Sequence, residues 1–443
     1  MSIGIASRSK TGFRSSRPGP VLLPAGRLGV PLMVKPDRPR TSGLRSGRLI
    51  KSTLSIVALI TCLAMGRLLL RPGADPAKIR LLANQAAQAG RWDQVETHLD
   101  RLSDPNPGDF LLRAIAANKL KQPDRAEEAL RRIPADGPLA AQAALWKGRL
   151  ELSRFRARPM EQALRRALEL DPKLVEAQRL LIYLHGTQGR RKELLKRFAA
   201  LAETSPLSFE LINHWCISHN DIFSEPLKLK TDLEKFLAAD PDDRWSRIAL
   251  ATNERILGHL DRADEILSYL PDSDAEGLAC RVEVAFDRGD YPLVERLLAS
   301  GPRDHAQLAR LRGRLALRQG DRAAALVHYR LSDALEPNHT ETTYGLAQSL
   351  PPGDARVSEI HSIRHSQRKL EEMLTTIDLN KTPKIQLCRD LGALCEASAY
   401  LPEAIAWYRL AITLDPINRE AQQALFRLKT TVSQAKRQRS PGS

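Results

Sequence analysis

Eight of the 28 prolines recur at nearly regular intervals along most of this 443-residue sequence, and each of the eight closes an apolar run. They stand at Pro134, Pro172, Pro206, Pro241, Pro271, Pro302, Pro337 and Pro416. The gaps up to Pro337 are 38, 34, 35, 30, 31 and 35 residues, and the last gap, 79, is about two repeats long. A proline ends a helix because its ring excludes the preceding residue from the helical region. The period therefore predicts a tandem array of small helical units that bury a core by stacking.

Residues 385–418 show the unit most clearly, as two helical patterns in succession. The first pattern places apolar residues at steps of three and four, at Leu387, Leu391, Leu394 and Cys395. Pro402 lies where a second helix begins, a position that tolerates a missing N–H. The apolar face of that helix comprises Ala404, Tyr408, Ala411 and Leu414. The pattern predicts an antiparallel hairpin of 34 residues with apolar stripes that it cannot bury alone.

This unit resembles a tetratricopeptide repeat (TPR) in its small and aromatic residues. The matching positions are the eighth, twentieth, twenty-fourth, twenty-seventh and thirty-second: Gly392, Ala404, Tyr408, Ala411 and Pro416. The fourth and eleventh positions, usually large aromatics, hold Cys388 and Cys395, which indicates looser packing in the first helix. Residues 306–339 match next best, through Gly313, Ala325, Tyr329 and Pro337. The resemblance implies an all-α fold, a TPR-like α-solenoid of stacked antiparallel hairpins with a concave protein-binding surface.

Two stretches depart from the repeat. Residues 210–241 carry HWCISHNDIF where a regular first helix is expected. Residues 340–383 contain the break Pro351-Pro352-Gly353, and they are predicted to hold a partial repeat or a longer helix.

The array is predicted to span residues 79–428 as about nine or ten hairpins, flanked by basic ends. Residues 1–48 are rich in Arg, Ser, Gly and Pro, a composition that predicts a disordered arm. Residues 72–78 are a short linker, and residues 429–443 are a flexible basic tail that begins as a capping helix.

Residues 49–71 are predicted to form a single transmembrane helix. Residues 52–66 carry no charge, and extension to 49–70 spans a bilayer if Lys51 and Arg67 reach the headgroups. Arg67 and three leucines directly follow the small residues Ala64 and Gly66, which favours an uncleaved anchor over a cleaved signal. Cleavage, which would leave a secreted or periplasmic chain, and a true start at Met33 stay open as alternatives.

The basic flank before this segment predicts its orientation. Six Lys or Arg lie in the twenty residues before Ser52 and four in the twenty from Arg67, and the arm adds more. The excess favours an N-terminus in the cytoplasm with the repeats outside. Arg greatly outnumbers Lys, which hints at a bacterium, where the predicted location is the inner membrane with periplasmic repeats.

The net charge of +16 belongs to the ends of the chain. Residues 1–51 hold eleven Lys or Arg and one acid, and the chain from Arg427 on holds five bases and no acid. Because the body between them is nearly neutral, the array itself is not expected to bind nucleic acid.

The five cysteines do not suggest a disulfide framework. Cys388 and Cys395 lie about 10 Å apart along one helix, too far to bridge. Cys62 lies in the uncharged segment 52–66. Cys216 and Cys280 fall in different repeats, and the cysteines of the array are interpreted as small core residues.

The sequence contains none of the common catalytic signatures, such as GxxxxGK[ST], HExxH, GxSxG or CxxC. No catalytic, cofactor-binding or metal-binding residue is assigned. His361 and His365 have a zinc-compatible spacing, but no third ligand is visible and Arg364 and Arg368 lie beside them.

Three arginines of the 306–339 unit lie at steps of four on one helix: Arg310, Arg314 and Arg318. Their fifth, ninth and thirteenth positions line the concave groove in TPR-like solenoids, so they are candidates to bind carboxylates of a partner. The alternative is a solvated face balanced by acids of neighbouring repeats. Trp245 and Tyr183 are further candidates, as aromatic anchors in the groove or as core and rim residues.

These features favour a membrane-anchored TPR scaffold that binds partner proteins through the solenoid groove and has no catalysis of its own. Two alternatives remain. One is binding of an anionic polymer through the basic tails and the arginine ridge. The other is an accessory subunit of an envelope enzyme or secretion complex. The sequence does not indicate the partner, the process or the oligomeric state.

Overall fold

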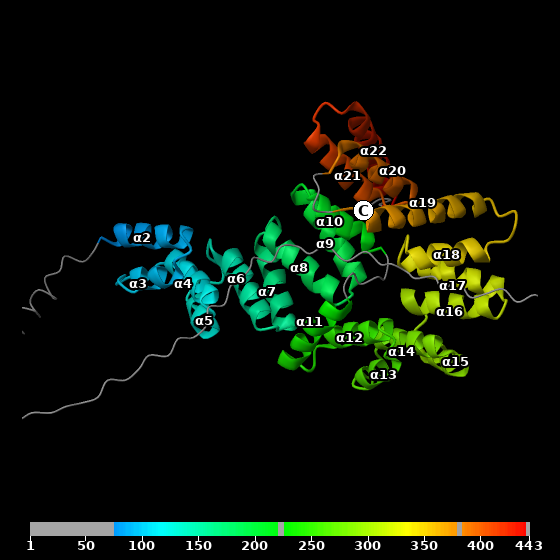
Figure 1. Cartoon of the computed structure of the whole chain (residues 1–443), viewed down its shortest axis with the longest axis horizontal. Helices are drawn as coiled ribbons and strands as arrows, with labels where there is room; N and C mark the ends of the chain where they lie inside the picture. Colours follow the sequence, from blue (N-terminus) through cyan, green and yellow to red (C-terminus); the bar gives the residue numbers. More distant parts are fainter. Residues whose placement is uncertain (1–74, 220–225, 379–382, 440–443) are drawn as a thin grey trace, which may run out of the picture. The chain divides into compact units, whose positions relative to one another are not determined.

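The computed structural model describes residues 75–219, 226–378 and 383–439, and within these residues every regular element is an α-helix. Figure 1 shows the helices in chain order. The described residues up to Leu150 and those from Glu151 on form two compact units. The boundary falls within α6 (Ala140–Ser153).

The first unit consists of two helix hairpins and the start of α6. Its helices are α2 (Pro76–Gln88), α3 (Trp92–Leu99), α4 (Pro107–Lys119) and α5 (Pro123–Arg131). Ile79, Ala83, Val95 and Leu99 form the core of the first hairpin, and all are buried. The buried face at Ile79, Ala83 and Ala86 has the spacing of three and four residues that is typical of an amphipathic helix.

The second unit contains the remaining helices. They are α7 (Ala157–Leu170), α8 (Val175–Thr187), α9 (Arg191–Thr204), α10 (Phe209–Ile217), α11 (Pro226–Ala239), α12 (Arg244–Ile256), α13 (Leu260–Leu267), α14 (Ala275–Arg288) and α15 (Tyr291–Ser300). The chain continues as α16 (Ala306–Arg318), α17 (Arg322–Leu335), α18 (Thr340–Ser349), α19 (Val357–Thr376), α20 (Ile385–Ala397), α21 (Leu401–Leu414) and α22 (Arg419–Arg439).

The proline period is confirmed as the end signal of eight helices. All eight prolines lie within four residues after a helix, namely after α5, α7, α9, α11, α13, α15, α17 and α21. Pro402 also occupies the first turn of α21, as predicted. The α-solenoid of antiparallel hairpins is therefore confirmed within the described residues.

Close contacts of glycine with tyrosine explain the TPR-like positions. A Cβ on Gly392 would lie 2.9 Å from the ring of Tyr408, and one on Gly313 would lie 2.8 Å from the ring of Tyr329. Each glycine belongs to the first helix of a hairpin and each tyrosine to the second. Because only a hydrogen fits at these places, the ring of the second helix can pack directly on the backbone of the first.

The irregular stretch at residues 340–383 holds the short helix α18 and the 20-residue helix α19, so the prediction of a longer helix is confirmed. The stretch at 210–241 holds the nine-residue α10, which ends at Ile217, and then α11. Cys388 and Cys395, expected in a loosely packed helix, are fully buried.

The C-terminal helices return to the middle of the second unit. A single apolar cluster joins Phe198 and Trp215 of α9 and α10 to Leu391, Trp407 and Leu428 of α20–α22. In Figure 1, α9 and α10 lie beside the orange and red helices α20–α22. Phe209 and Trp407 meet edge to face, with ring centroids 5.3 Å apart. A solenoid in which each hairpin packs only on the next one along the chain would not contain this contact between α9–α10 and α20–α22.

The predicted membrane segment, residues 49–71, lies outside the described residues, as does the N-terminal arm at 1–48. Among the helices that the structure does describe, none combines the length and the apolar character that a membrane span requires.

Candidate partner-binding site

Ion pairs about thirty residues apart connect successive hairpins. In five of them an arginine binds an acid further along the chain: Arg80–Asp109, Arg244–Asp274, Arg255–Glu283, Arg310–Glu341 and Arg389–Glu420. Four of these acids, all but Glu283, lie in the first turn of the next hairpin or cap it. There the carboxylate is also stabilised by the helix dipole. The spacing of 28 to 31 residues is close to one repeat, so these pairs connect neighbouring hairpins.

Arg310 forms one of these ion pairs between hairpins, so it is not available to a partner protein. The residue is 3% exposed, its Nε lies 3.2 Å from Glu341, and its Nη1 lies 3.6 Å from Glu336. Glu336 is also paired with Arg191 of α9. Burial by itself raises the pKa of Glu336, but Arg191, His339 and Arg310 together lower it below its ordinary value. The structure therefore agrees with the alternative interpretation of Arg310, in which acidic residues nearby in the array balance its charge.

Arg314 and Arg318 lie in a different environment on the same helix. Both are exposed, and no carboxylate among the described residues forms an ion pair with either. The guanidinium of Arg314 lies 4.5 Å from the ring centroid of Phe286, and that of Arg318 lies 3.6 Å from that of Tyr291. These cation–π contacts hold two neighbouring cations in place on exposed side chains. The pair can therefore receive carboxylates with little loss of side-chain entropy.

Trp245 is half-buried at the start of α12, and two arginines lie over its indole. The guanidinium carbons of Arg190 and Arg244 are 4.8 Å and 4.3 Å from the ring centroid. Arg190 in turn binds Glu161 at 2.7 Å, and Arg244 binds Asp274. The ring thus packs within a network of ion pairs between α7, α12 and α14.

Tyr183 on α8 is 39% exposed, so part of its ring is accessible. Partial burial, with the nearby carboxylate of Asp232, raises the pKa of its phenol above the ordinary value. Its hydroxyl is therefore protonated at neutral pH and can donate a hydrogen bond.

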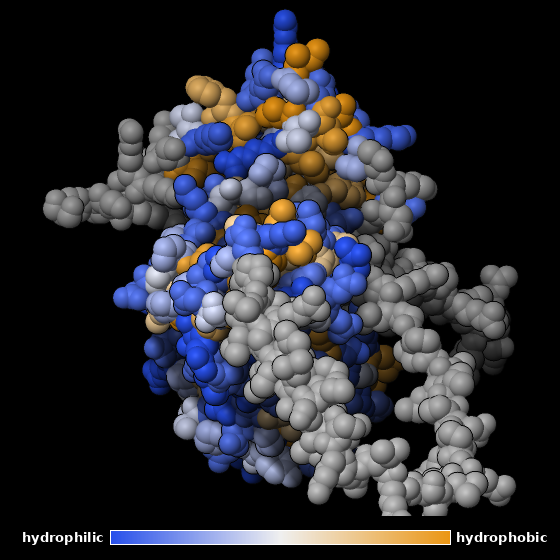
Figure 2. Space-filling model, turned by 90° about the vertical axis from the view of Figure 1, so that its left-hand side faces the viewer, coloured by the Kyte–Doolittle hydropathy of each residue, from blue (hydrophilic) through white to orange (hydrophobic). Residues whose placement is uncertain are grey.

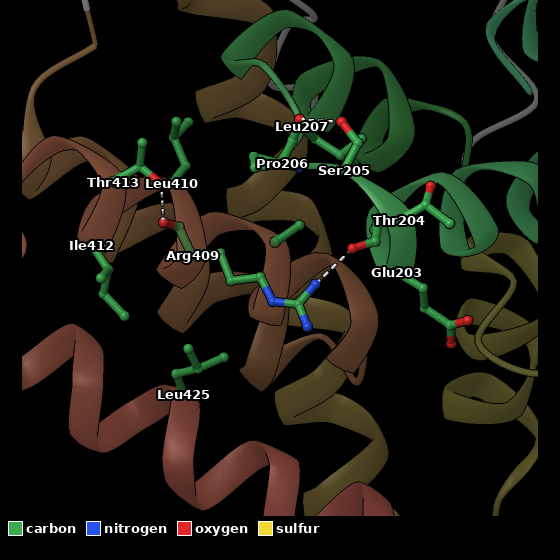
Figure 3. A pocket seen from close by; sticks show the side chains of 12 residues that line it. Glu203, Thr204, Ser205, Pro206, Leu207, Arg409, Leu410, Ile412, Thr413 and Leu425 are labelled. Carbon is green, nitrogen blue, oxygen red and sulfur yellow. Dashed lines mark hydrogen bonds between the residues drawn. The ribbon is translucent and has the colours of Figure 1, made fainter. Parts of the chain in front are cut away.

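A cleft of about 390 Å³ opens where the end of α9 meets α21 and α22. Ala202, Leu207, Leu410, Ile412 and Leu425 provide most of its apolar wall (Figure 3). The Arg409 side chain reaches across the cleft and donates a hydrogen bond from Nη1 to the backbone oxygen of Ala202, at 2.6 Å. Residues about 200 positions apart form this cleft, so no local pattern in the sequence could have indicated it.

A buried polar cluster lies beside the docked helices α20–α22, which together are called the C-terminal hairpin below. The Nε2 of His219 is 2.6 Å from Glu403, and its ring stacks on Tyr400 with centroids 3.8 Å apart. Thr340 donates a hydrogen bond to the backbone oxygen of His219. Burial raises the pKa of the Tyr400 phenol, so this hydroxyl stays protonated. These contacts fix the end of α10 against the turn between α20 and α21.

The C-terminal hairpin also exposes large apolar side chains. Leu414, Ile417 and Phe426 are 38%, 83% and 76% exposed. Figure 2 shows apolar side chains gathered at the top of the molecule, the part that α20–α22 form in Figure 1. No group of His, Cys, Asp and Glu side chains in the described part of the chain is arranged to hold a metal ion, and His361 and His365 are exposed on α19.

These helices and their repeat-spaced ion pairs define the class of protein, an α-solenoid of stacked helix hairpins. No family model matches the chain. Among curated proteins, the "Response regulator RamR" of Streptomyces coelicolor is 27% identical over 174 residues, which cover 38% of this chain and 81% of that protein.

Similar solved structures include chains described as TPR proteins. A tetratricopeptide repeat protein from Parabacteroides merdae is 18% identical with a TM-score of 0.30, and covers 55% of this chain and 99% of its own. The Cut9–Hcn1 hetero-tetramer of APC/C is 13% identical with a TM-score of 0.33, covering 85% of this chain and 94% of its own. Pseudomonas aeruginosa pilF is 17% identical with a TM-score of 0.25, covering 47% and 97%. These scores are too low to show a shared overall arrangement, so the class rests on the chain's own helices.

Proposed function

We propose that this protein is a scaffold that binds an acidic segment of a partner protein at Arg314 and Arg318. The observation that carries the proposal is the state of these two side chains: exposed, without an acidic partner among the described residues, and held over Phe286 and Tyr291. Three other arginines of the second unit, Arg244, Arg255 and Arg310, are instead paired with acids about one repeat away. The α16 pair is therefore the part of the predicted ridge that remains open to a ligand, and the proposal assigns no chemical reaction.

The test measures binding of a fluorescein-labelled poly-glutamate peptide by anisotropy. Arg314→Glu with Arg318→Glu should weaken binding by about tenfold or more, because two charge-assisted hydrogen-bond donors become repulsive groups. A matched control changes the same net charge at two exposed positions on other helices, Arg322→Glu with Arg368→Glu. If both double variants lose affinity equally, the binding reflects overall charge and the proposed site is wrong.

We also propose that residues 49–71 tether the scaffold to a membrane. The support is the uncharged run at residues 52–66 between Lys51 and Arg67, which spans a bilayer when its flanks are included. Tethering places the solenoid and a membrane-bound partner at a high effective concentration. In a bacterium, the basic arm orients the repeats toward the periplasm.

Expression of the full chain in bacteria, followed by carbonate washing of the membranes, tests the tether. The protein should stay in the pellet, and deletion of residues 49–71 should release it. N-terminal sequencing of the mature chain distinguishes an uncleaved anchor from a cleaved signal. Reporter enzymes fused after residue 439 test the orientation, since a reporter active in the cytoplasm would contradict periplasmic repeats.

A further inference from the structure

Two free cysteines meet inside the second unit although 179 residues separate them in the sequence. The Sγ atoms of Cys216 on α10 and Cys395 on α20 are 3.6 Å apart. Both residues are buried, with exposed fractions of 2% and 0%. The sequence places these cysteines in different repeats, and only the return of the C-terminal hairpin onto α10 brings them together.

Contacts with neighbouring side chains hold the two sulfur atoms in place. The indole N–H of Trp407 donates to the Cys216 sulfur at 3.3 Å. One turn along the chain from Cys216, His219 is bound to Glu403 and stacked on Tyr400. Since a disulfide bond is about 2.05 Å long, the sulfurs need to approach by about 1.5 Å. A movement of that size is within the reach of small side-chain rotations, without separation of the helices.

We propose that Cys216 and Cys395 are a disulfide-forming pair that links α10 covalently to the C-terminal hairpin under oxidising conditions. The bond would close a loop that contains every helix from α11 to α19. Such a bond restricts the unfolded chain and makes release of the hairpin unfavourable. Docking of α20–α22 would then depend on the redox state of the compartment.

The reaction is thiol–disulfide exchange with a low-molecular-weight disulfide such as oxidised glutathione. One cysteine thiolate attacks the glutathione disulfide and releases one glutathione thiolate. The second cysteine attacks the resulting mixed disulfide and releases the other. Two cysteine thiols are oxidised, one glutathione disulfide is reduced to two thiols, and the cysteine protons pass to the two leaving thiolates.

The burial of the two thiols indicates when the exchange with glutathione can take place. The apolar surroundings of Cys395, and the adjacent Cys216, raise the pKa of its thiol well above the ordinary value. Because the thiolate is the reactive form, the docked pair exchanges slowly. The bond therefore forms during folding or while the hairpin is transiently open, and it is protected from reductants once the hairpin has docked.

The experiment refolds the full chain in mixtures of oxidised and reduced glutathione, traps free thiols with an alkylating reagent and measures the mass. Of the five cysteines, three should be alkylated after oxidation, and a digest should contain one linked peptide with Cys216 and Cys395. The oxidised protein should also unfold at a higher temperature than the reduced protein. Both measurements use the unaltered sequence, so they do not depend on the folding of a variant.

Variants then assign the effect to this pair. Cys216→Ser and Cys395→Ser should each abolish the linked peptide and the dependence of the unfolding temperature on oxidation. Cys388 is as buried as Cys395 and lies on the same helix, α20. Cys388→Ser should therefore preserve the linked peptide and the effect of oxidation on the unfolding temperature. Five alkylated cysteines at every glutathione ratio, a linked peptide with another pair, or a bond found only in denatured protein would overturn the proposal.

Discussion

At the scale of single residues, glycines set how closely the helices approach one another. The ring of Tyr329 lies against both Gly313 of α16 and Gly345 of α18, so one tyrosine joins two hairpins. A Cβ on Gly345 would lie 2.1 Å from the Cζ atom of this ring. The residue cannot carry a side chain unless the ring moves, although alanine is the better helix former.

Gly345→Ala is expected to destabilise the protein by about 1–3 kcal/mol, because overpacking exceeds the gain of roughly 1 kcal/mol in helix propensity. Gly186→Ala on α8 is the matched control, since its Cβ would meet nothing closer than 3.9 Å. That variant should be neutral or stabilised by up to about 1 kcal/mol. Urea unfolding measures both, and a stabilised Gly345→Ala protein would contradict the packing of Tyr329.

Glu161 of α7 is the residue for which pH should matter most clearly. Burial alone raises its pKa, but hydrogen bonds from His185, Arg190 and Arg165 dominate and lower the pKa far below 4.5. The folded state thus binds the proton less tightly than the unfolded state does. The resulting stability is fully present above the unfolded pKa of 4.5 and is lost as the pH falls below it.

The difference in unfolding free energy between the wild type and Glu161→Gln is therefore expected to be largest near neutral pH and to shrink below pH 4.5. Urea unfolding across this pH range measures it. Glu169→Gln on the same helix is the control, because its side chain is 64% exposed and pairs with Arg166 at the surface. It should change stability by less than about 1 kcal/mol at every pH. A difference for Glu161→Gln that grows in acid would refute the network.

At the scale of the element, α16 divides one row of arginines into two roles. Arg310 is buried, and it pairs with Glu341 of the next hairpin and with Glu336 at the end of α17. Arg314 and Arg318 are instead exposed over aromatic rings of the preceding hairpin. The residue 31 positions after Arg310 is Glu341, but the corresponding residues for Arg314 and Arg318 are Gly345 and Ser349. An acid one repeat downstream is thus the sequence signal that separates structural from available arginines.

Arg310→Met should lower stability by about 1–3 kcal/mol, because it removes the buried cation that pairs with both Glu341 and Glu336, although Glu336 keeps its pair with Arg191. Arg314→Met, one turn later on the same helix, should cost about 1 kcal/mol or less. Thermal or urea unfolding gives the stability, and poly-glutamate anisotropy gives the binding. The proposed division of roles requires the opposite order in binding, with Arg314→Met the more damaging change; equal effects in both assays would refute it.

At the scale of the whole second unit, docking of the C-terminal hairpin on α9 and α10 is the decisive contact. Trp407 is fully buried there and meets Phe209 edge to face. Its indole N–H donates a hydrogen bond to the sulfur of Cys216. The hairpin thereby forms one core with helices that precede it by about 200 residues. Phe426 of α22, by contrast, is exposed to solvent.

Trp407→Ala should cost about 3–5 kcal/mol and release the hairpin, since it leaves a large cavity between α10 and α21. Phe426→Ala should change stability by no more than about 0.5 kcal/mol, because that ring is 76% exposed. Limited proteolysis should cleave the Trp407→Ala protein near residue 384 much faster than the Phe426→Ala protein. Equal resistance of both proteins would show that the hairpin is not held by this core.

The hairpins themselves could be predicted from the sequence because their signals are local. A proline ends a helix through its own neighbours, and Gly392 with Tyr408 indicates a close contact between two helices joined by a short turn. The candidate site was predictable in part: the periodicity places Arg310, Arg314 and Arg318 on one face. It does not show which of them is bound by an acid in the next repeat.

The sequence by itself determined the helical repeat, since that depends on residues only a few positions apart. Tertiary structure alone decided that α20–α22 return to α10, that Cys216 meets Cys395, and that Arg409 crosses a cleft to Ala202. Apolar faces attract without direction, so a stripe of buried residues does not specify its partner. The partner is selected by shape and by polar contacts such as His219 with Glu403, which exist only after distant segments have folded together.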